Sequence, residues 1–208
     1  MSLFSLEHSK AAYRADFMLY GAAVAGLAIF LLLAGPRNHR LAIVMVALGG
    51  LLGWSLIEYL MHRLVLHGLP PFCHWHEQHH QRPMALLGAP TLLSGGLIAA
   101  LVFVPAWLAG DLWHASALTL GVSAGYLVFS ITHHGMHHLR GDSGWMKRRK
   151  RWHAVHHHAA GRPGCYGVTS GFWDHVFATT AQPPGRRRQR GAMLPVSSDR
   201  MISTRRFN

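Results

Sequence analysis

Four stretches of this chain carry no Asp, Glu, Lys or Arg and are long enough to cross a lipid bilayer as helices. They run from 17 to 34, 41 to 57, 83 to 110 and 112 to 131. Since an α-helix rises about 1.5 Å per residue, such a stretch extends about 25 Å or more, close to the thickness of a hydrocarbon core. The pattern predicts an all-α integral membrane protein with about four transmembrane helices.

Two of these stretches need a choice between readings. The first is followed by Gly35, Pro36 and Arg37 and not by a small-x-small cleavage site, so we expect a retained membrane helix and not a signal peptide. The third is 28 residues long and contains Pro90 and Pro105. Because proline interrupts a helix, we expect either a re-entrant start or a kinked helix there.

The linkers between neighbouring stretches are short, so the four helices should pair as two antiparallel hairpins. One hairpin joins 17–34 to 41–60, and the other joins about 86–108 to 112–131. Each hairpin then ends in a histidine-rich segment. Both histidine-rich segments are therefore expected on the same side of the membrane, where they would form a helical cap.

The distribution of basic residues indicates which side that is. Net charge is +12, and of the 20 Lys and Arg only Arg37 and Arg40 fall outside 1–16, 61–85 and the part of the chain after 131. This is a positive-inside bias, which predicts that the histidines face the cytoplasm, from the inner membrane if the source is bacterial. Since no nucleic-acid-binding motif accompanies the charge, we expect no nucleic-acid partner.

Three segments follow from these patterns. Residues 1–16 form a polar N-terminal tail, and 17–180 form one membrane domain with its cap. Residues 181–208 are Arg-rich and of low hydrophobicity, which predicts a basic, disordered tail.

The histidines are spaced so that several can point at one place. His76, His79 and His80 stand at i, i+3 and i+4, which is one face of a helix, and the same spacing recurs in the cluster near residue 155. His62 and His67 are five apart and would diverge by about 140° on a continuous α-helix. We expect them to converge because the helix unwinds at His67, before a Gly-Leu-Pro-Pro stop.

A further pair stands at i and i+4, either His133 with His137 or His134 with His138, which brings the number of imidazoles to ten. Ten are too many for one metal ion, which takes four to six ligands, so two ions are predicted. The chain has only eight acidic residues, which favours a site made almost entirely of histidine. Glu77 and Asp174 are the candidates for carboxylates that orient the imidazoles from behind.

The motifs H-x4-H, H-x-x-H-H, H-x3-H and H-x-x-H-H occur in an order that resembles the fatty acid hydroxylase superfamily. That superfamily includes sterol desaturases, fatty acid 2-hydroxylases and carotene hydroxylases, and the resemblance covers about 40–180. Two further stretches resemble the fatty acid 2-hydroxylase branch, namely T-H-H-G-M-H-H from Thr132 and G-V-T-S-G-F-W-D-H-V-F from Gly167.

The resemblance implies a di-iron membrane enzyme that uses O2, although zinc could occupy the site in purified protein. His133 and His137 match the family motif, while His134 and His138 have equal spacing and remain the alternative pair. The ligands that the resemblance implies are His62, His67, His76, His79, His80, His133, His137, His153, His156 and His157.

The predicted activity is hydroxylation of a lipid chain drawn from the bilayer, most simply a fatty acyl chain. No segment is long enough for a fused cytochrome domain, so electrons should come from a separate ferredoxin or a cytochrome with its reductase. The alternative is a carotenoid or sterol hydroxylase or desaturase. Weaker alternatives are a non-catalytic metal-binding membrane protein and a metal transporter. The candidates for lining the substrate pocket are Trp152, Tyr166, Phe172 and Trp173.

Overall fold

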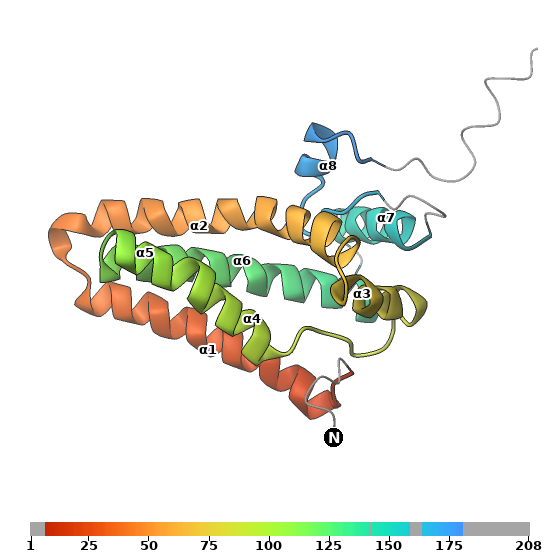
Figure 1. Cartoon of the computed structure of the whole chain (residues 1–208), viewed down its shortest axis with the longest axis horizontal. Helices are drawn as coiled ribbons and strands as arrows, with labels where there is room; N and C mark the ends of the chain where they lie inside the picture. The colour runs from red at the N-terminus through yellow and green to blue at the C-terminus, as the bar shows by residue number, and fades with distance from the viewer. Residues whose placement is uncertain (1–6, 142, 159–163, 181–208) are drawn as a thin grey trace, which may run out of the picture.

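The computed structural model describes residues 7–141, 143–158 and 164–180, and in this part of the chain the regular secondary structure is helical, without a β-strand (Figure 1). Four helical stretches are long and apolar enough to cross a membrane. The prediction of an all-α integral membrane protein is confirmed. The predicted disordered tail lies outside the described residues.

The first hairpin consists of α1 (Lys10–Ala34) and α2 (Arg40–Leu60), joined through the short helix η1 (Arg37–His39). Helix α1 begins seven residues before the uncharged stretch does. The reason is a cap at its start, because the Ser9 hydroxyl accepts a hydrogen bond of 3.2 Å from the Ala12 amide. The polar residues 10–16 therefore belong to the helix.

The second hairpin is interrupted in its first limb, as the prolines predicted. It runs through α4 (Thr91–Ile98), the π-helical segment η3 (Ala99–Phe103) and α5 (Val104–Ala109) before α6 (Leu112–His138) returns. Proline has no amide hydrogen, so Pro105 leaves one bond of the helical ladder unmade beside the wider π-turn. The limb is a kinked helix that begins after Pro90.

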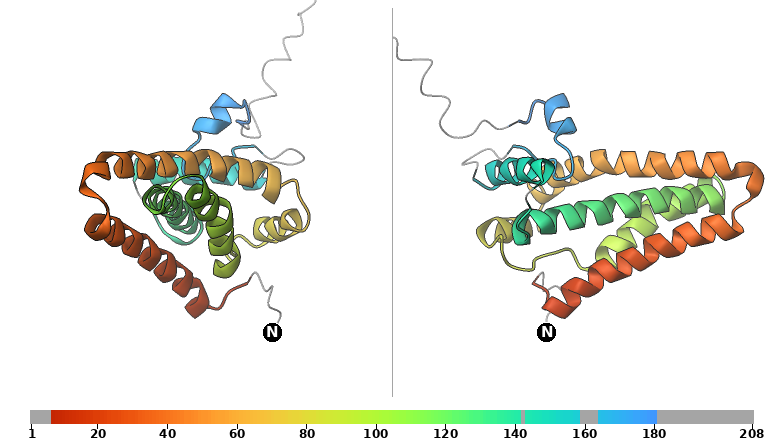
Figure 2. Two further views of the ribbon diagram at one scale, coloured as in Figure 1. Left: turned by 60° about the vertical axis from the view of Figure 1, so that its left-hand side comes forward. Right: turned by 180° about the vertical axis from the view of Figure 1, so that it is seen from behind.

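Helix α6 is the central helix, with α1, α2 and the α4–α5 limb around it (Figures 1 and 2). It approaches α2 most closely where glycines face each other. A Cβ on Gly50 would lie 2.6 Å from the Leu118 carbonyl oxygen, and one on Gly121 would lie 2.7 Å from the Leu51 amide nitrogen. Only glycine fits at either position, and the two helices that carry histidines at their ends are thereby held together.

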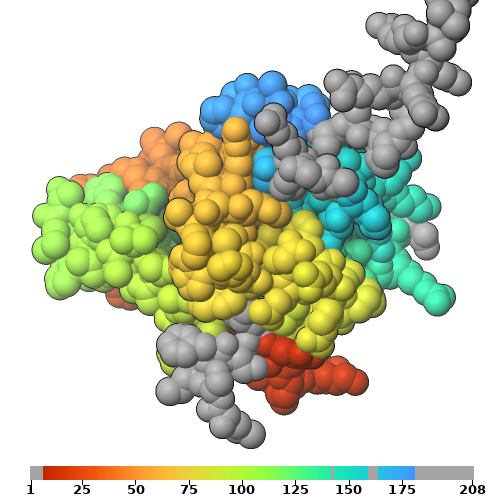
Figure 3. All heavy atoms as spheres, turned by 45° about the vertical axis from the view of Figure 1, so that its right-hand side comes forward, coloured from red at the N-terminus to blue at the C-terminus, as the bar shows by residue number. Residues whose placement is uncertain are grey.

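The histidine-rich helices lie together at one end of the bundle, as the hairpin pairing predicted. These are α3 (Phe72–Gln81) and α7 (Gly144–His158), with the short α8 (Phe172–Val176) beside them (Figures 1 and 2). The loops within both hairpins lie at the opposite end. Figure 3 shows α3, in yellow, covering this end between α2, α7 and the start of α1.

Candidate metal centre

His62 and His67 are brought together by a π-helical turn. The segment η2 (Met61–Leu66) continues α2 with hydrogen bonds from residue i to i+5, and His67 caps it. Residues five apart in sequence then lie nearly above one another, and the two ring centroids are 5.2 Å apart. The helix does end at His67, as expected, but the convergence comes mainly from the π-turn that precedes it.

The imidazoles from η2, α3, α6 and α7 gather into two groups. In each group one potential ligand nitrogen of every member lies within 4.8 Å of the others. The five-histidine group is His62, His67, His76, His80 and His156. The four-histidine group is His79, His133, His137 and His153.

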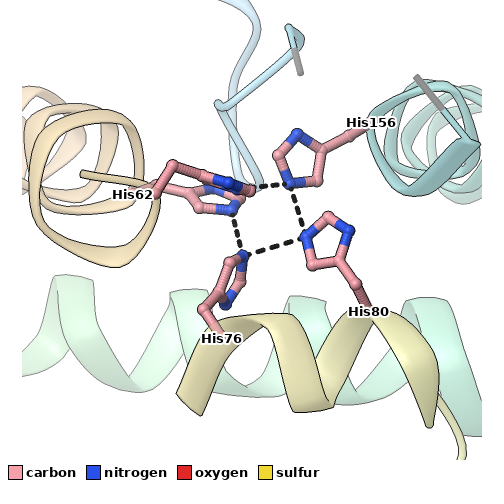
Figure 4. A group of neighbouring side chains, drawn as sticks. His62, His76, His80 and His156 are labelled. Atoms are coloured by element: carbon pink, nitrogen blue, oxygen red, sulfur yellow. Dashed lines mark hydrogen bonds between the residues drawn. The ribbon is translucent and has the colours of Figure 1, made fainter. Parts of the chain in front are cut away.

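In the five-histidine group the Nε2 atoms face one another (Figure 4). The Nε2 of His76 lies 3.0 Å from that of His62 and 3.1 Å from that of His80. The Nε2 of His156 lies 3.1 Å from the Nε2 atoms of His80 and His67. These four contacts lie at the end of α2, between α3 and α7.

Two members of this group have their tautomer fixed from behind. His62 donates from Nδ1 to the Tyr166 carbonyl oxygen at 2.6 Å, and His156 donates from Nδ1 to the Gly164 carbonyl oxygen at 2.9 Å. A carbonyl oxygen only accepts, so both Nδ1 atoms carry the proton of the neutral ring. Their Nε2 atoms therefore present bare lone pairs to the centre of the group.

Protons alone cannot satisfy these contacts. His62 and His156 are both acceptors, and His76 and His80 lie between them in a chain of three Nε2–Nε2 contacts. If the Nε2 atoms of His76 and His80 both carry a proton, the two protons face each other across the His76–His80 contact. If the Nε2 of either residue is unprotonated, its lone pair faces the lone pair of His62 or of His156. A metal cation at the centre satisfies all the lone pairs at once, so the residues fit a bound metal.

The four-histidine group shows a similar deficit. The Nε2 atoms of His137 and His153 are 2.8 Å apart, and the buried Nε2 of His79 has no hydrogen-bond partner among the residues that the structure describes. His157 contacts both groups, because its Nε2 lies 3.0 Å from that of His153 and its ring stacks on His80 at 4.2 Å. Buried polar atoms normally have a partner, and a metal ion would be the partner of the Nε2 of His79.

The electrostatic setting keeps the imidazoles outside the spans neutral. Burial lowers the pKa of His67 to about 4 and the pKa of His79 to about 3. The pKa of His156 and that of His157 are each lowered to about 3, also chiefly by burial. The pKa of His76 is lowered as well, by burial and then by the neighbouring imidazoles. At neutral pH these rings are therefore ready to bind metal without first losing a proton.

His134 and His138 lie outside both groups. The Nδ1 of His134 is 3.3 Å from the Tyr13 hydroxyl, and its ring stacks on that of His138 at 4.7 Å. The rings of His133 and His137 belong to the four-histidine group instead. This placement favours the family alignment, while the assignment of these residues as ligands stays a prediction.

Neither predicted carboxylate bonds to an imidazole in the described residues. Glu77 is exposed and accepts a hydrogen bond of 3.1 Å from Gln81. Asp174 is fully buried, but it accepts from backbone amides, those of Tyr166 at 2.7 Å and Gly167 at 2.8 Å. Asp174 therefore acts on the loop whose carbonyl groups hold two of the histidines.

Glu58 is a buried carboxylate that the sequence reasoning did not single out for such a role. It is 3% exposed and accepts hydrogen bonds from the amides of Val168 at 2.6 Å and Thr169 at 2.9 Å. The signal was present, because Glu58 lies one helical turn before His62 at the end of an otherwise uncharged stretch. An acidic residue there is costly unless it is bonded or functional.

Of the four aromatic candidates for the substrate pocket, only Tyr166 lies against the histidine groups. Its ring is 5.5 Å from that of His67. Trp152 stacks on His175, which is not one of the ten predicted ligands. Trp173, a residue of α8, packs against Phe172, which is 61% exposed. A role for these three in binding a substrate stays a prediction.

An apolar cavity of about 310 Å³ lies between the two hairpins. It opens between α2, the α4–α5 limb and α6, and three glycines of α2 form one wall. The lining residues are Gly49, Gly50, Gly53, Ile57, Leu101, Val102, Pro105, Ala106, Leu118 and Val122.

Comparison with known proteins identifies the family of this arrangement. The family model described as fatty acid hydroxylase matches residues 47–179, which is more than half of the chain. A solved structure of scs7p, in which only the hydroxylase domain is visible, superposes with a TM-score of 0.69 at 27% identity, covering 83% of this chain and 68% of that one.

Curated relatives agree with this match over the same region. A dihydroceramide fatty acyl 2-hydroxylase of Arabidopsis thaliana is 32% identical over 145 residues, which cover 62% of this chain and 58% of the relative. The fatty acid 2-hydroxylase of Homo sapiens is 31% identical over 150 residues, covering 65% of this chain and 40% of the relative. This chain thus spans between about two fifths and three fifths of these relatives' lengths.

Proposed function

The chain belongs to the fatty acid hydroxylase family, and on this premise we propose that it is a membrane oxygenase that hydroxylates a lipid acyl chain, using O2 and two iron ions held by its histidines. Relatives are named fatty acyl and fatty acid 2-hydroxylases, which favours a fatty acyl chain as substrate and the carbon next to its carbonyl group as the position attacked.

One observation carries this proposal. All four histidine motifs converge at the end of the two hairpins, and the five-histidine group has Nε2 contacts that protons cannot satisfy together. The two groups, with His157 between them, provide for two ions. Bound iron would supply the redox chemistry that activates O2 toward an unactivated C–H bond.

The residues of the chain have other tasks in the reaction. The carbonyl groups of Tyr166 and Gly164 keep His62 and His156 in the tautomer that binds metal. Tyr166 is buried with its ring against His67, and it helps to exclude water from the five-histidine group. The overall reaction puts one oxygen atom of O2 into the C–H bond and reduces the other to water. It needs two electrons and two protons, which a separate ferredoxin or cytochrome system would supply.

We propose that the acyl chain lies in the apolar cavity between the hairpins. A lipid can enter there sideways from the bilayer, and the cavity runs along α2, whose continuation carries His62. Ile57 lines the cavity and stands just over one helical turn before that histidine. The polar end of the substrate would then lie at the membrane surface, with the tail toward the other leaflet.

The histidine end is proposed to face the cytoplasm, because most basic residues lie on that side in the sequence. Cys73, partly exposed on α3, provides a test. A membrane-impermeant thiol reagent should label Cys73 in inside-out vesicles and leave it unlabelled in intact cells. Labelling in intact cells with an undisturbed membrane would reverse the assigned orientation.

The test of the activity is mass spectrometry of total lipids from cells that express the chain, beside a His137→Ala variant produced at the same level. A gain of one oxygen on acyl chains that is absent from the variant would establish an acyl hydroxylase. Oxygen gained by carotenoids or sterols would establish the alternative substrate class. Absence of any oxidised or desaturated lipid, with iron and reductant present, would leave a metal-binding protein without this chemistry.

A further inference from the structure

The two histidine groups differ in how their members are held from behind. In the five-histidine group His62 and His156 donate from Nδ1 to carbonyl oxygens of one loop, formed by residues 164–169. In the four-histidine group no Nδ1 atom has a hydrogen bond to any residue that the structure describes. Since such bonds fix the tautomer and direction of a ligand, the two prospective sites are not equivalent.

Two buried carboxylates hold the 164–169 loop. Asp174 accepts from the Tyr166 amide through Oδ1 and from the Gly167 amide through Oδ2. Glu58 accepts from the Val168 and Thr169 amides through Oε1, and from the Thr169 hydroxyl at 2.5 Å through Oε2. Four consecutive amides are thus taken by two side chains, one from α8 and one from α2.

The backbone of the 164–169 loop is strained, so other residues must hold it in its conformation. Cys165, between the two carbonyl groups that hold histidines, has φ of 59°, a left-handed conformation that is unfavourable for a residue other than glycine. At Gly167 a Cβ would collide with the Ser170 carbonyl oxygen and lie 2.9 Å from Asp174 Oδ2. The carboxylates therefore supply the bonds that keep a strained loop in place.

We propose that Glu58 and Asp174 are positioning residues that, through the 164–169 loop, set the tautomers of His62 and His156 and make the five-histidine group the tighter of two metal sites. This inference rests on the proposed function only in requiring that the histidines bind metal. Neither carboxylate touches an imidazole, so neither is a ligand.

Replacing each carboxylate by the amide of the same shape should have different effects at the two positions, because their hydrogen bonds differ. Both oxygens of Asp174 accept from backbone amides, so either orientation of an Asn side chain in Asp174→Asn sets an NH2 group against an N–H. In Glu58→Gln the carbonyl oxygen can keep both backbone bonds, while the NH2 group donates to the rotatable Thr169 hydroxyl. The first substitution should release the loop, and the second should keep it.

The experiment measures Zn²⁺ affinity of the full-length purified protein by competition with a chelator, and Zn²⁺ stoichiometry by elemental analysis. Each substitution is introduced into two single-site backgrounds. In the His79→Ala background His137 is also replaced by alanine, so only two members of the four-histidine group remain beside an intact five-histidine group. In the His76→Ala background His62 and His156 are replaced as well, so only two members of the five-histidine group remain beside an intact four-histidine group. Glu77→Gln is the matched control, because Glu77 is a nearby carboxylate that bonds only Gln81.

In the His79→Ala background we expect Asp174→Asn to raise the Kd for Zn²⁺ by about 10- to 100-fold. We expect Glu58→Gln and Glu77→Gln to leave the Kd unchanged there. In the His76→Ala background none of the three should change it. Before any of these substitutions, the His79→Ala protein should bind Zn²⁺ more tightly than the His76→Ala protein.

An equal rise in both backgrounds would overturn the proposal, because it would reveal general loss of the fold. So would an unchanged Kd in both, or a loss from Glu58→Gln as large as that from Asp174→Asn. If Asp174→Asn yields no folded protein, Thr169→Val removes one donor to Glu58 and should give a smaller rise at the same site only; no rise would refute it. Absence of Zn²⁺ binding in both backgrounds would instead overturn the metal centre of the proposed function.

Discussion

If the acyl chain lies between the hairpins, a bulky side chain at Gly53 should shorten the chains that the enzyme accepts. A Cβ at Gly53 or at Gly49 would meet no atom within 4 Å, although both residues line the cavity. Gly53→Phe and Gly49→Phe can therefore fill part of the 310 Å³ without displacing the bundle. Their effect should be on the substrate and not on folding.

The depth of the two positions predicts how the two variants differ. Gly53 is one turn closer to His62 than Gly49, which is about 6 Å along the helix. With C–C bonds of about 1.5 Å in a zigzag, 6 Å corresponds to about five methylene groups. Each methylene excluded from an apolar site costs about 0.8 kcal/mol, or about fourfold in kcat/KM. Gly53→Phe should therefore exclude chains about five carbons shorter than those excluded by Gly49→Phe.

The assay is the chain-length distribution of hydroxylated acyl chains in cells expressing each variant, with protein and metal content measured alongside. The distribution should shift toward shorter chains, further for Gly53→Phe than for Gly49→Phe, at unchanged metal content. The matched control is Gly26→Phe on α1, which also has open space at its Cβ and does not line the cavity. Unchanged distributions in both cavity variants would refute the chain path.

Three further predictions follow from the site. Removal of metal by a chelator should abolish hydroxylation, Fe²⁺ should restore it, and Zn²⁺ should restore thermal stability alone; activity with Zn²⁺ would contradict the redox role. The metal-free protein should lose stability as pH falls from about 6.5 toward 3. Burial lowers the pKa of His156 to about 3 in the folded protein, while its ordinary value of 6.5 applies to the unfolded chain, so the unfolded chain binds more protons in that pH range. At pH 5 this single buried group costs about 2 kcal/mol, and equal melting temperatures at pH 5 and 7.5 would contradict it. Gly167→Ala should lower Zn²⁺ affinity at the five-histidine group in the same way as Asp174→Asn, since its Cβ would strike the Ser170 carbonyl; unchanged affinity would show that the loop can give way.

Much of the architecture could be predicted from the sequence because it depends on local rules. Charge-free stretches indicate membrane-spanning helices, short linkers indicate hairpins, and a spacing of three or four residues indicates side chains on one helical face. The convergence of His62 and His67 required more, since a spacing of five suits neither an α-helix nor a strand. It depends on a π-turn, and no sequence rule marks where a helix widens in this way.

The carboxylates show why the rest of the site was beyond the sequence. Asp174 was expected to orient imidazoles directly, but it is separated from them by a loop, and Glu58 was not among the predicted carboxylates. The role of Glu58 depends on contacts with residues 110 and 111 positions away, namely Val168 and Thr169. A carboxylate buried at 3% exposure must find donors, and here the free donors are the amides of a loop without regular structure. The loop amides need acceptors and the carboxylates need donors, so the same hydrogen bonds satisfy both. These bonds also hold the loop so that two of its carbonyl groups point at His62 and His156.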